Sequence, residues 1–387
     1  MMNNFEFFNP VKIIFGKDQL DKLAVQIPAN KKVLMIYGGG SIFKNGVHAA
    51  IKEVLKNFEV VEFSGIEPNP RYETTMKAVE LIKAEKINFL LAVGGGSVID
   101  ATKFIAAAAL FNDGDPWDIL AKRSPVKAAL PFGSVLTLPA TGSEMNSGGV
   151  ITREATHEKF AFSSALTFPV FSFLLPDAAS SLPKRQVANG VVDAFMHTME
   201  QYMTYPAGAP LQDRFAESIL QTLVEEGPKA YANPADYEAM SNLMWSATMA
   251  LNGLIGCGVP QDWAVHMMGH ELTAKFGIDH ARTLAVIAPS HYKYNFENKK
   301  EKLAQFGERV WGITAGTLDE KAHAAIEKME AFFQSLGVDT KLSKYTEEYK
   351  GTAQHISKRF TDRGWAKLGE RQSLKPSDVE KIVEMSY

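Results

Sequence analysis

The sequence predicts an α/β N-terminal half followed by an all-helical C-terminal half. In the first half, short runs rich in β-branched residues alternate with longer amphipathic stretches, which is typical of a parallel sheet covered by helices on both faces. From about Gln186 the strand pattern stops, and helical segments separated by Gly, Pro and Asn follow one another. The change falls at Leu182-Pro183, so we expect an α/β domain over residues 1–182 and an all-helical domain over residues 183–387.

The individual elements follow from the period of the apolar residues. In the first half we expect strands over 33–37, 60–63, 89–93 and 135–138, and helices over 46–57, 72–85 and 98–110. In the second half we expect helices near 186–203, 211–231, 237–254, 262–276, 299–311 and 318–336.

Composition limits the classes of function. The 41 basic and 44 acidic residues give a net charge of −3, which supplies no positive field for nucleic acid. The single cysteine excludes an intrachain disulfide, and the N-terminus lacks the pattern of a signal peptide. No uncharged apolar run reaches the ~20 residues that a membrane-spanning helix needs. We therefore expect a cytoplasmic protein that acts on a small molecule, without nucleic acid or membrane as a partner.

The glycine-rich segment Gly94-Gly95-Gly96-Ser97 follows the strand expected over 89–93. Glycines let the backbone approach a ligand closely, and the free N–H groups of a helix start attract an anion, so this segment is a candidate phosphate-binding loop. The alternative is a tight turn in which Ser97 caps the helix and Asp100 reaches back to complete a capping box. Since the segment matches neither of the common glycine-rich phosphate motifs, both alternatives stay open.

A second glycine-rich segment, Gly38-Gly39-Gly40-Ser41, follows the strand expected over 33–37. NAD-selective sites usually place a carboxylate near such a strand end to accept the ribose 2′-hydroxyl, and none occurs from Val33 through Gly46. Small glycines leave room for a 2′-phosphate and Ser41 can donate to it. Lys44 offers a positive charge or is a solvated surface residue. This segment favours NADP over NAD.

Two helical segments carry potential metal ligands four residues apart. Asp193 and His197 form the first pair, His266 and His270 form the second, and His280 follows in a loop. Residues at positions i and i+4 share a helix face, so each pair can converge on one point. A single histidine here is more simply a hydrogen-bonded core or surface residue, and Asp193 with His197 could be a local pair. Two such pairs and a further histidine, His280, indicate a shared ion.

Three imidazoles and a carboxylate suit a divalent transition ion such as Zn²⁺ or Fe²⁺ and suit Mg²⁺ or Ca²⁺ poorly, because the latter prefer oxygen ligands. An ion held in this way acts as a Lewis acid on a substrate oxygen. Beside a nicotinamide, the ion would stabilise the alkoxide oxygen whose carbon gains or loses a hydride.

Over essentially its whole length the sequence resembles the iron-containing, or group III, metal-dependent alcohol dehydrogenases. Within them it is similar to the NADPH-dependent aldehyde reductase and butanol dehydrogenase branch. The resemblance rests on Glu67-Pro68-Asn69-Pro70, Gly94-Gly95-Gly96-Ser97-x-x-Asp100, Leu138-Pro139-Ala140-Thr141-Gly142-Ser143-Glu144, the stretch from Pro183 to Glu200, and His266-x3-His270-x9-His280.

The resemblance implies a Rossmann-like N-terminal domain and an all-helical C-terminal domain, as in the dehydroquinate synthase-like architecture, with one Fe²⁺ or Zn²⁺. The residues that match the family's metal ligands are Asp193, His197, His266 and His280, while His270 matches a histidine that faces the site without binding the ion. The residues that match its NADP(H) contacts are Gly38, Gly39, Ser41, Asn69, Gly95, Gly96, Ser97, Asp100, Thr137, Thr141 and Lys159. His270 and Asp100 are the catalytic candidates.

The sequence departs from the family pattern in two places. The last metal-ligand candidate lies in Asp279-His280-Ala281, where many relatives have Pro-His-Gly. The segment before Thr141-Gly142-Ser143-Glu144 is shorter than the Thr-Ala-Gly-Thr form found elsewhere in the family. The ligand assignment is unaffected by either departure.

These observations predict an NADP(H)-dependent alcohol dehydrogenase that reduces small aliphatic aldehydes, with a homodimer as the expected assembly. One alternative is an NAD-dependent member of the same family, of the lactaldehyde, propanediol or glycerol type. Another is a metal hydrolase in which the same Asp and histidines activate water and the glycine segments are only turns. A third is a non-catalytic protein that binds metal or nucleotide. Binding of NADPH would separate the dehydrogenase from the hydrolase.

Overall fold

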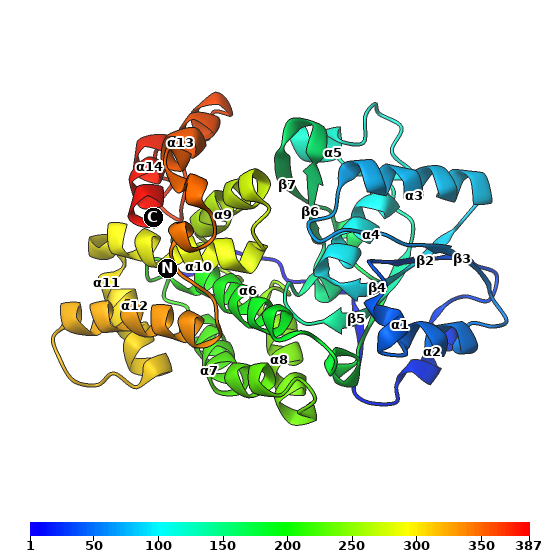
Figure 1. Ribbon diagram of the computed structural model, residues 1–387, viewed down its shortest axis with the longest axis horizontal. Coiled ribbons are helices and arrows are strands. Elements are labelled where there is room, and N and C mark those ends of the chain that lie inside the picture. Colours follow the sequence, from blue (N-terminus) through cyan, green and yellow to red (C-terminus); the bar gives the residue numbers. More distant parts are fainter. The chain divides into compact units, whose positions relative to one another are not determined.

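The computed structural model describes residues 1–387, and the chain divides into two compact units (Figure 1). One unit comprises Phe8–Pro183 with Asn233–Thr248, and the other comprises Met1–Phe7, Lys184–Ala232 and Met249–Tyr387.

The first unit is built on a six-stranded sheet in which every pairing is parallel. The strand order is β1-β8-β5-β4-β2-β3, with bounds β1 Lys12–Phe15, β2 Lys32–Tyr37, β3 Glu59–Phe63, β4 Phe89–Gly95, β5 Phe132–Leu138 and β8 Phe171–Leu174. The four strands predicted from the sequence are β2 to β5. Strands β1 and β8 were not predicted, because each has only four residues and too few alternating positions to show a period.

Helices cover both faces of this sheet (Figure 1). Odd-numbered residues of β2 and β4, such as Met35 and Leu91, share a core with α2 (Val47–Val54), whereas α4 (Gly96–Ala108) packs on β4, β5 and α3 (Tyr72–Glu85). The unit also contains α1 Ser41–Lys44, α5 Asp118–Ala121, most of α8 (Tyr237–Ala250) and the antiparallel hairpin of β6 (Gly148–Arg153) and β7 (Glu158–Ser163). This alternation of parallel strands and helices confirms the predicted α/β class.

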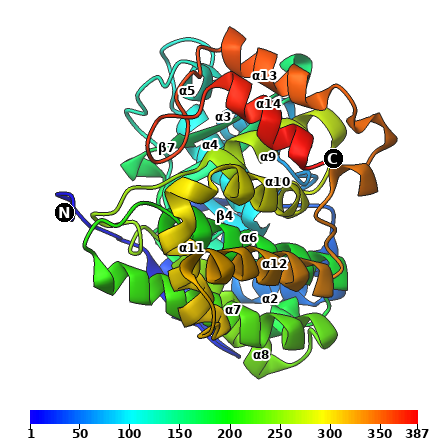
Figure 2. The same cartoon turned by 90° about the vertical axis from the view of Figure 1, so that its left-hand side faces the viewer.

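The second unit is helical. Its helices are α6 Lys184–Tyr202, α7 Pro210–Ala232, α9 Ala264–Phe276, α10 His280–Tyr294, α11 Phe296–Trp311, α12 Leu318–Ser335, α13 Thr352–Asp362 and α14 Pro376–Met385. Helix α6 is buried along most of its length and packs against α7 and α10. Figure 2 shows α11 beside α12, and α13 beside α14. An aromatic cluster around Phe195, which contacts Phe306, Phe332 and Phe333, fills the core between α6, α11 and α12.

Three helices of this unit, α10, α13 and α14, were not predicted. The expectation that His280 lies in a loop was wrong, because His280 is the first residue of α10. Pro289 lies inside that helix, and a proline normally argues against helix continuation. No helix in the structure combines the length and hydropathy needed to cross a bilayer.

Candidate active site

The segment Gly94–Ser97 joins the end of β4 directly to the start of α4, which begins at Gly96. A Cβ added at Gly94 would lie 2.6 Å from Val98 Cγ2, and one at Gly96 would lie 2.3 Å from Thr141 Oγ1. Both positions therefore require glycine on packing grounds alone. The first N–H groups of a helix have no partner within the helix, so the start of α4 is suited to an anion such as a pyrophosphate.

The structure contradicts the alternative in which Ser97 and Asp100 form a capping box. Gly95 is the N-cap of α4, and no side chain caps this helix. Asp100 instead accepts hydrogen bonds from Ser143 Oγ at 2.6 Å and from the backbone N–H of Val150 at 2.9 Å. Its partners lie 43 and 50 residues further along the chain, so local spacing could not reveal them.

Lys103, one turn after Asp100 on α4, also bonds to the segment that Asp100 contacts. Its ammonium group donates to Ser143 Oγ, Asn146 Oδ1 and the carbonyl oxygen of Gly148 at 2.7–2.8 Å. Burial raises the pKa of Asp100 and lowers that of Lys103 to about 8. Asp100 and Lys103 tie the 141–150 segment to α4, and a catalytic role for Asp100 stays a prediction.

The three glycines of the Gly38–Gly40 segment differ in whether a side chain could replace the hydrogen at that position. A Cβ at Gly38 would lie 3.1 Å from the carbonyl oxygen of Ile66, and Gly40 has a φ of +97°, a conformation that favours glycine. At Gly39 a Cβ would meet nothing within 4 Å. Ser41 begins α1 directly after the segment. A side chain is therefore accommodated at Gly39 alone.

The carboxylate beside this segment belongs to Glu62 on β3 and already has partners. It accepts a hydrogen bond from Tyr37 Oη at 3.0 Å and lies 2.9 Å from both His48 Nε2 and Lys52 Nζ. Burial alone would raise the pKa of Glu62, but the hydrogen bonds from His48, Lys52 and Tyr37 lower it to about 2. Glu62 thus holds Tyr37 at the end of β2, immediately before the glycine segment.

This cluster makes stability depend on pH. Because the pKa of Glu62 falls from its ordinary 4.5 to about 2 on folding, its stabilising contribution is present above about pH 4.5 and is lost as the pH falls toward 2. Glu62→Gln should therefore lower the melting temperature by a few degrees at pH 7 and by much less at pH 3. Thermal unfolding of both proteins at the two pH values measures this, and an equal loss at both would contradict the assignment.

Two further candidates for the dinucleotide site lie together. Lys159 on β7 donates from Nζ to Asn69 Oδ1 at 2.8 Å, although the two residues are 90 positions apart. Asn69 has a positive φ of 56°, which few residues other than glycine and asparagine adopt readily. Thr137 lies on β5 and is buried.

The predicted metal ligands gather on three helices of the helical unit. One potential ligand atom from each of Asp193 (α6), His266 (α9) and His280 (α10) lies within 4.8 Å of the other two. His280 Nε2 is 3.8 Å and His197 Nε2 is 3.9 Å from Asp193 Oδ1. The rings of His197 and His266 stack with their centroids 4.9 Å apart.

This donor set fits a transition metal ion. Ligand atoms about 3.4 Å apart surround a tetrahedral ion at bond lengths of about 2.0–2.1 Å, so small side-chain movements would bring the observed spacings to that geometry. Nitrogen donors with one carboxylate are the ligands that Zn²⁺ and Fe²⁺ accept.

His270 lies one helical turn beyond His266 on α9. Its ring centroid is 4.9 Å from that of His280 and 6.4 Å from that of His266. It therefore lies beside the ligand group; like His197, it is not among the three residues whose ligand atoms converge.

Glu200 lies beside the candidate ligands and was not predicted from the sequence. It is almost fully buried on α6, and its Oε1 lies 3.5 Å from His266 Nδ1 and accepts from the backbone N–H of His266 at 3.3 Å. Burial, followed by the charge of Asp262, raises the pKa of Glu200 to about 8. Its position three residues after His197 on the same helix face was the available signal.

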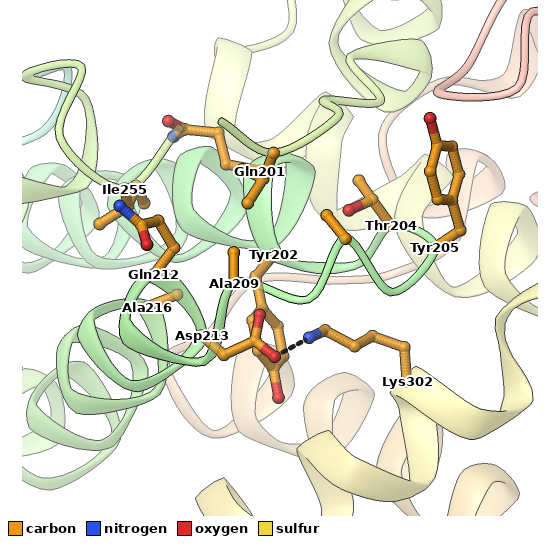
Figure 3. Close-up of a pocket in the computed structure, with 12 residues that line it drawn as sticks. Gln201, Tyr202, Thr204, Tyr205, Ala209, Gln212, Asp213, Ala216, Ile255 and Lys302 are labelled. Carbon is orange, nitrogen blue, oxygen red and sulfur yellow. Dashed lines mark ion pairs between the residues drawn. The ribbon is translucent and has the colours of Figure 1, made fainter. Parts of the chain in front are cut away.

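A pocket elsewhere in the helical unit contains none of the predicted site residues (Figure 3). Its lining comes from the end of α6, the segment between α6 and α7, the start of α7, the 255–259 segment and α11, with Gln201, Tyr202 and Gln212 among the lining residues. Lys302 Nζ and Asp213 Oδ2 pair across it at 2.6 Å. Burial lowers the pKa of Lys302.

Comparison with known proteins identifies the class to which this fold and site belong. Residues 10–176 match the iron-containing alcohol dehydrogenase family, and residues 187–387 match the C-terminal region of the Fe-containing alcohol dehydrogenase family. The chain belongs to the iron-containing alcohol dehydrogenases and is an oxidoreductase.

Among its relatives is the NADPH-dependent aldehyde reductase YqhD of Escherichia coli, which is 52% identical over 385 residues, 99% of each chain. The crystal structure of YqhD matches with a TM-score of 0.98 and 51% identity, covering 100% of this chain and 99% of that one. A probable NADH-dependent butanol dehydrogenase of Bacillus subtilis is 41% identical over the full length of both chains. These matches confirm the predicted family and fold.

Proposed function

We propose that this protein is an NADPH-dependent aldehyde reductase that converts small aliphatic aldehydes to alcohols. The observation that carries the proposal is the convergence of Asp193, His266 and His280 in a chain that belongs throughout to the alcohol dehydrogenase family. The relative named for NADPH-dependent aldehyde reduction supports the choice of cofactor and substrate class. The family assignment argues against the metal hydrolase.

Each region has its own role in this proposal. The α/β region, residues 1–182, binds the dinucleotide, with the pyrophosphate at the start of α4 and the 2′-phosphate at the Gly38–Ser41 segment. The remaining dinucleotide contacts are Asn69, Gly95, Gly96, Ser97, Asp100, Thr137, Thr141 and Lys159. The helical region, residues 183–387, holds one Fe²⁺ or Zn²⁺ and the substrate. The homodimer and the cytoplasmic location stay predictions.

The chemistry divides between the bound groups and the side chains. When bound, NADPH supplies a hydride to the carbonyl carbon and the divalent ion polarises the carbonyl oxygen. Asp193, His197, His266 and His280 hold the ion, and the packing of α6, α9 and α10 fixes their directions. His270 supplies the proton that converts the reduced oxygen to a hydroxyl, either directly or through a water.

Steady-state rates test this function. We expect higher kcat/KM with NADPH than with NADH over a series of straight-chain aldehydes, on protein whose metal content has been measured. Comparable rates with NADH would favour the NAD-dependent alternative. The absence of reduction with both cofactors in metal-loaded protein would exclude the proposal.

His270→Ala tests the proton donor. A general acid contributes about 10²–10⁴-fold, so the rate should fall by a factor in this range while about one ion per chain remains bound. Metal analysis alongside kinetics distinguishes the possibilities, since loss of the ion would place His270 among the ligands and refute its role as a proton donor.

A further inference from the structure

Helix α6 carries four polar side chains in a row at four-residue spacing: Arg185, Asn189, Asp193 and His197. Residues spaced in this way lie on one helix face, one turn above another. The last two belong to the proposed metal site. The first two are not metal ligands, and the mechanism gives them no role.

Residues at the start of α10 contact this row of side chains on α6. Asp279, the residue before α10, accepts hydrogen bonds on Oδ2 from Arg185 Nε and Asn189 Nδ2, each at 2.8 Å. The next residue, His280, lies 3.8 Å from Asp193 Oδ1 through its Nε2. Consecutive residues at the start of α10 therefore face successive turns of α6.

Asp279 does not perform the usual task of an aspartate at its position. It is the N-cap of α10, where an Asp side chain normally accepts from the backbone N–H groups of the first turn, yet no side-chain cap bond is present. Only its backbone carbonyl oxygen accepts from the N–H groups of Arg282 and Thr283, at 3.0 and 3.2 Å. The carboxylate is directed instead to α6.

Arg282 reinforces the same contact from the α10 side. Its Nε donates to Asn189 Oδ1 at 3.1 Å, so the Asn189 amide donates to Asp279 and accepts from Arg282. Arg282 also donates from Nη1 to the carbonyl oxygen of Gly337 at 3.3 Å. Both ends of the Asn189 amide are thus fixed by the first turn of α10 and the residue before it.

His280 needs such an anchor more than the other ligand candidates do. Its side chain is 22% exposed, whereas those of Asp193 and His197 are each 6% exposed in the interior of α6. It occupies the first position of its helix, and helix ends fray more readily than helix interiors.

We propose that Asp279 is a positioning residue of the metal site: through Arg185 and Asn189 it fixes the register of α10 against α6 and so places the His280 imidazole opposite Asp193. This inference rests on the metal site of the proposed function. Partners that orient metal ligands typically change metal affinity by about 10–100-fold when they are removed.

The test measures Co²⁺ binding to the full-length apoprotein by chelator competition, together with the visible absorption of the bound ion. Asp279→Ala should weaken Co²⁺ binding about 10-fold or more and alter the Co²⁺ spectrum. Asp279→Asn retains an oxygen acceptor and should restore most of the affinity. Asp319→Ala removes an exposed carboxylate that pairs with Lys300 at the surface and serves as the matched control, with wild-type binding expected.

The same measurement in a His280→Ala background separates positioning from general destabilisation. If Asp279 acts through His280, adding Asp279→Ala to His280→Ala should cause no further loss of affinity. An equal further loss, or wild-type affinity and spectrum in Asp279→Ala alone, would overturn the inference. Failure of the wild-type chain itself to bind Co²⁺ would refute the proposed metal site and with it this inference, and that result is distinct from either of the others.

Discussion

His266→Ala is expected to remove the bound metal ion and, with it, nearly all turnover. His266 contributes one of the three ligand atoms that converge within 4.8 Å, and its ring stacks on that of His197. Loss of a direct ligand should cost more than the 10–100-fold in affinity that accompanies loss of an outer partner. The rate should fall to that of the chelator-treated wild-type enzyme.

Elemental analysis per chain and Co²⁺ titration measure the loss directly, independently of activity. His355→Ala is the matched control, because His355 is an exposed histidine on α13 outside the ligand group, and it should retain about one ion per chain. Full metal content and full rate in His266→Ala would show that the ion is held elsewhere. Addition of a chelator to the wild-type enzyme should abolish activity, and restoring the ion should recover it.

The convergence of the candidate metal ligands could be predicted because most of their geometry is local. Asp193 and His197 share a turn of α6 and His266 lies at the start of α9, so the i, i+4 spacing already placed these side chains on defined faces. His280 was predicted to lie near them, but in a loop and not at the start of a helix. Its alignment with Asp193 depends on the register of α10 against α6, which no local pattern contains.

The long-range contacts around the site were hidden for the same reason. Glu200 contacts His266 across 66 positions, and Lys159 contacts Asn69 across 90. Asp100 illustrates how local spacing misleads: its distance from Ser97 suggested a capping box, whereas its hydrogen bonds reach Ser143 and Val150. The Asp100 carboxylate is buried, and a buried carboxylate requires several hydrogen-bond donors. One helical turn does not supply them, so the donors come from residues distant in the sequence.

Gly39→Asp is expected to shift cofactor preference from NADPH toward NADH by about 100-fold in the ratio of kcat/KM values, which corresponds to about 2.7 kcal/mol. A carboxylate at this position would repel a 2′-phosphate and accept a hydrogen bond from a ribose 2′-hydroxyl. The position is suited to the test because an added Cβ at Gly39 meets nothing within 4 Å, whereas Gly38 is crowded by Ile66 and Gly40 has a positive φ. The substitution therefore changes charge with little effect on packing.

Gly39→Asn is the matched control, since it has nearly the shape of aspartate without its charge and should retain most of the preference for NADPH. Lys44→Ala measures the contribution of the nearby lysine and should weaken NADPH binding by no more than about 1 kcal/mol while leaving NADH binding unchanged, as expected of a solvated charge. The measurement is the ratio of kcat/KM values with NADPH and NADH for each protein. If Gly39→Asp and Gly39→Asn shift the ratio equally, charge repulsion is not the cause; if the wild-type enzyme uses both cofactors equally well, the Gly38–Ser41 segment does not select the 2′-phosphate.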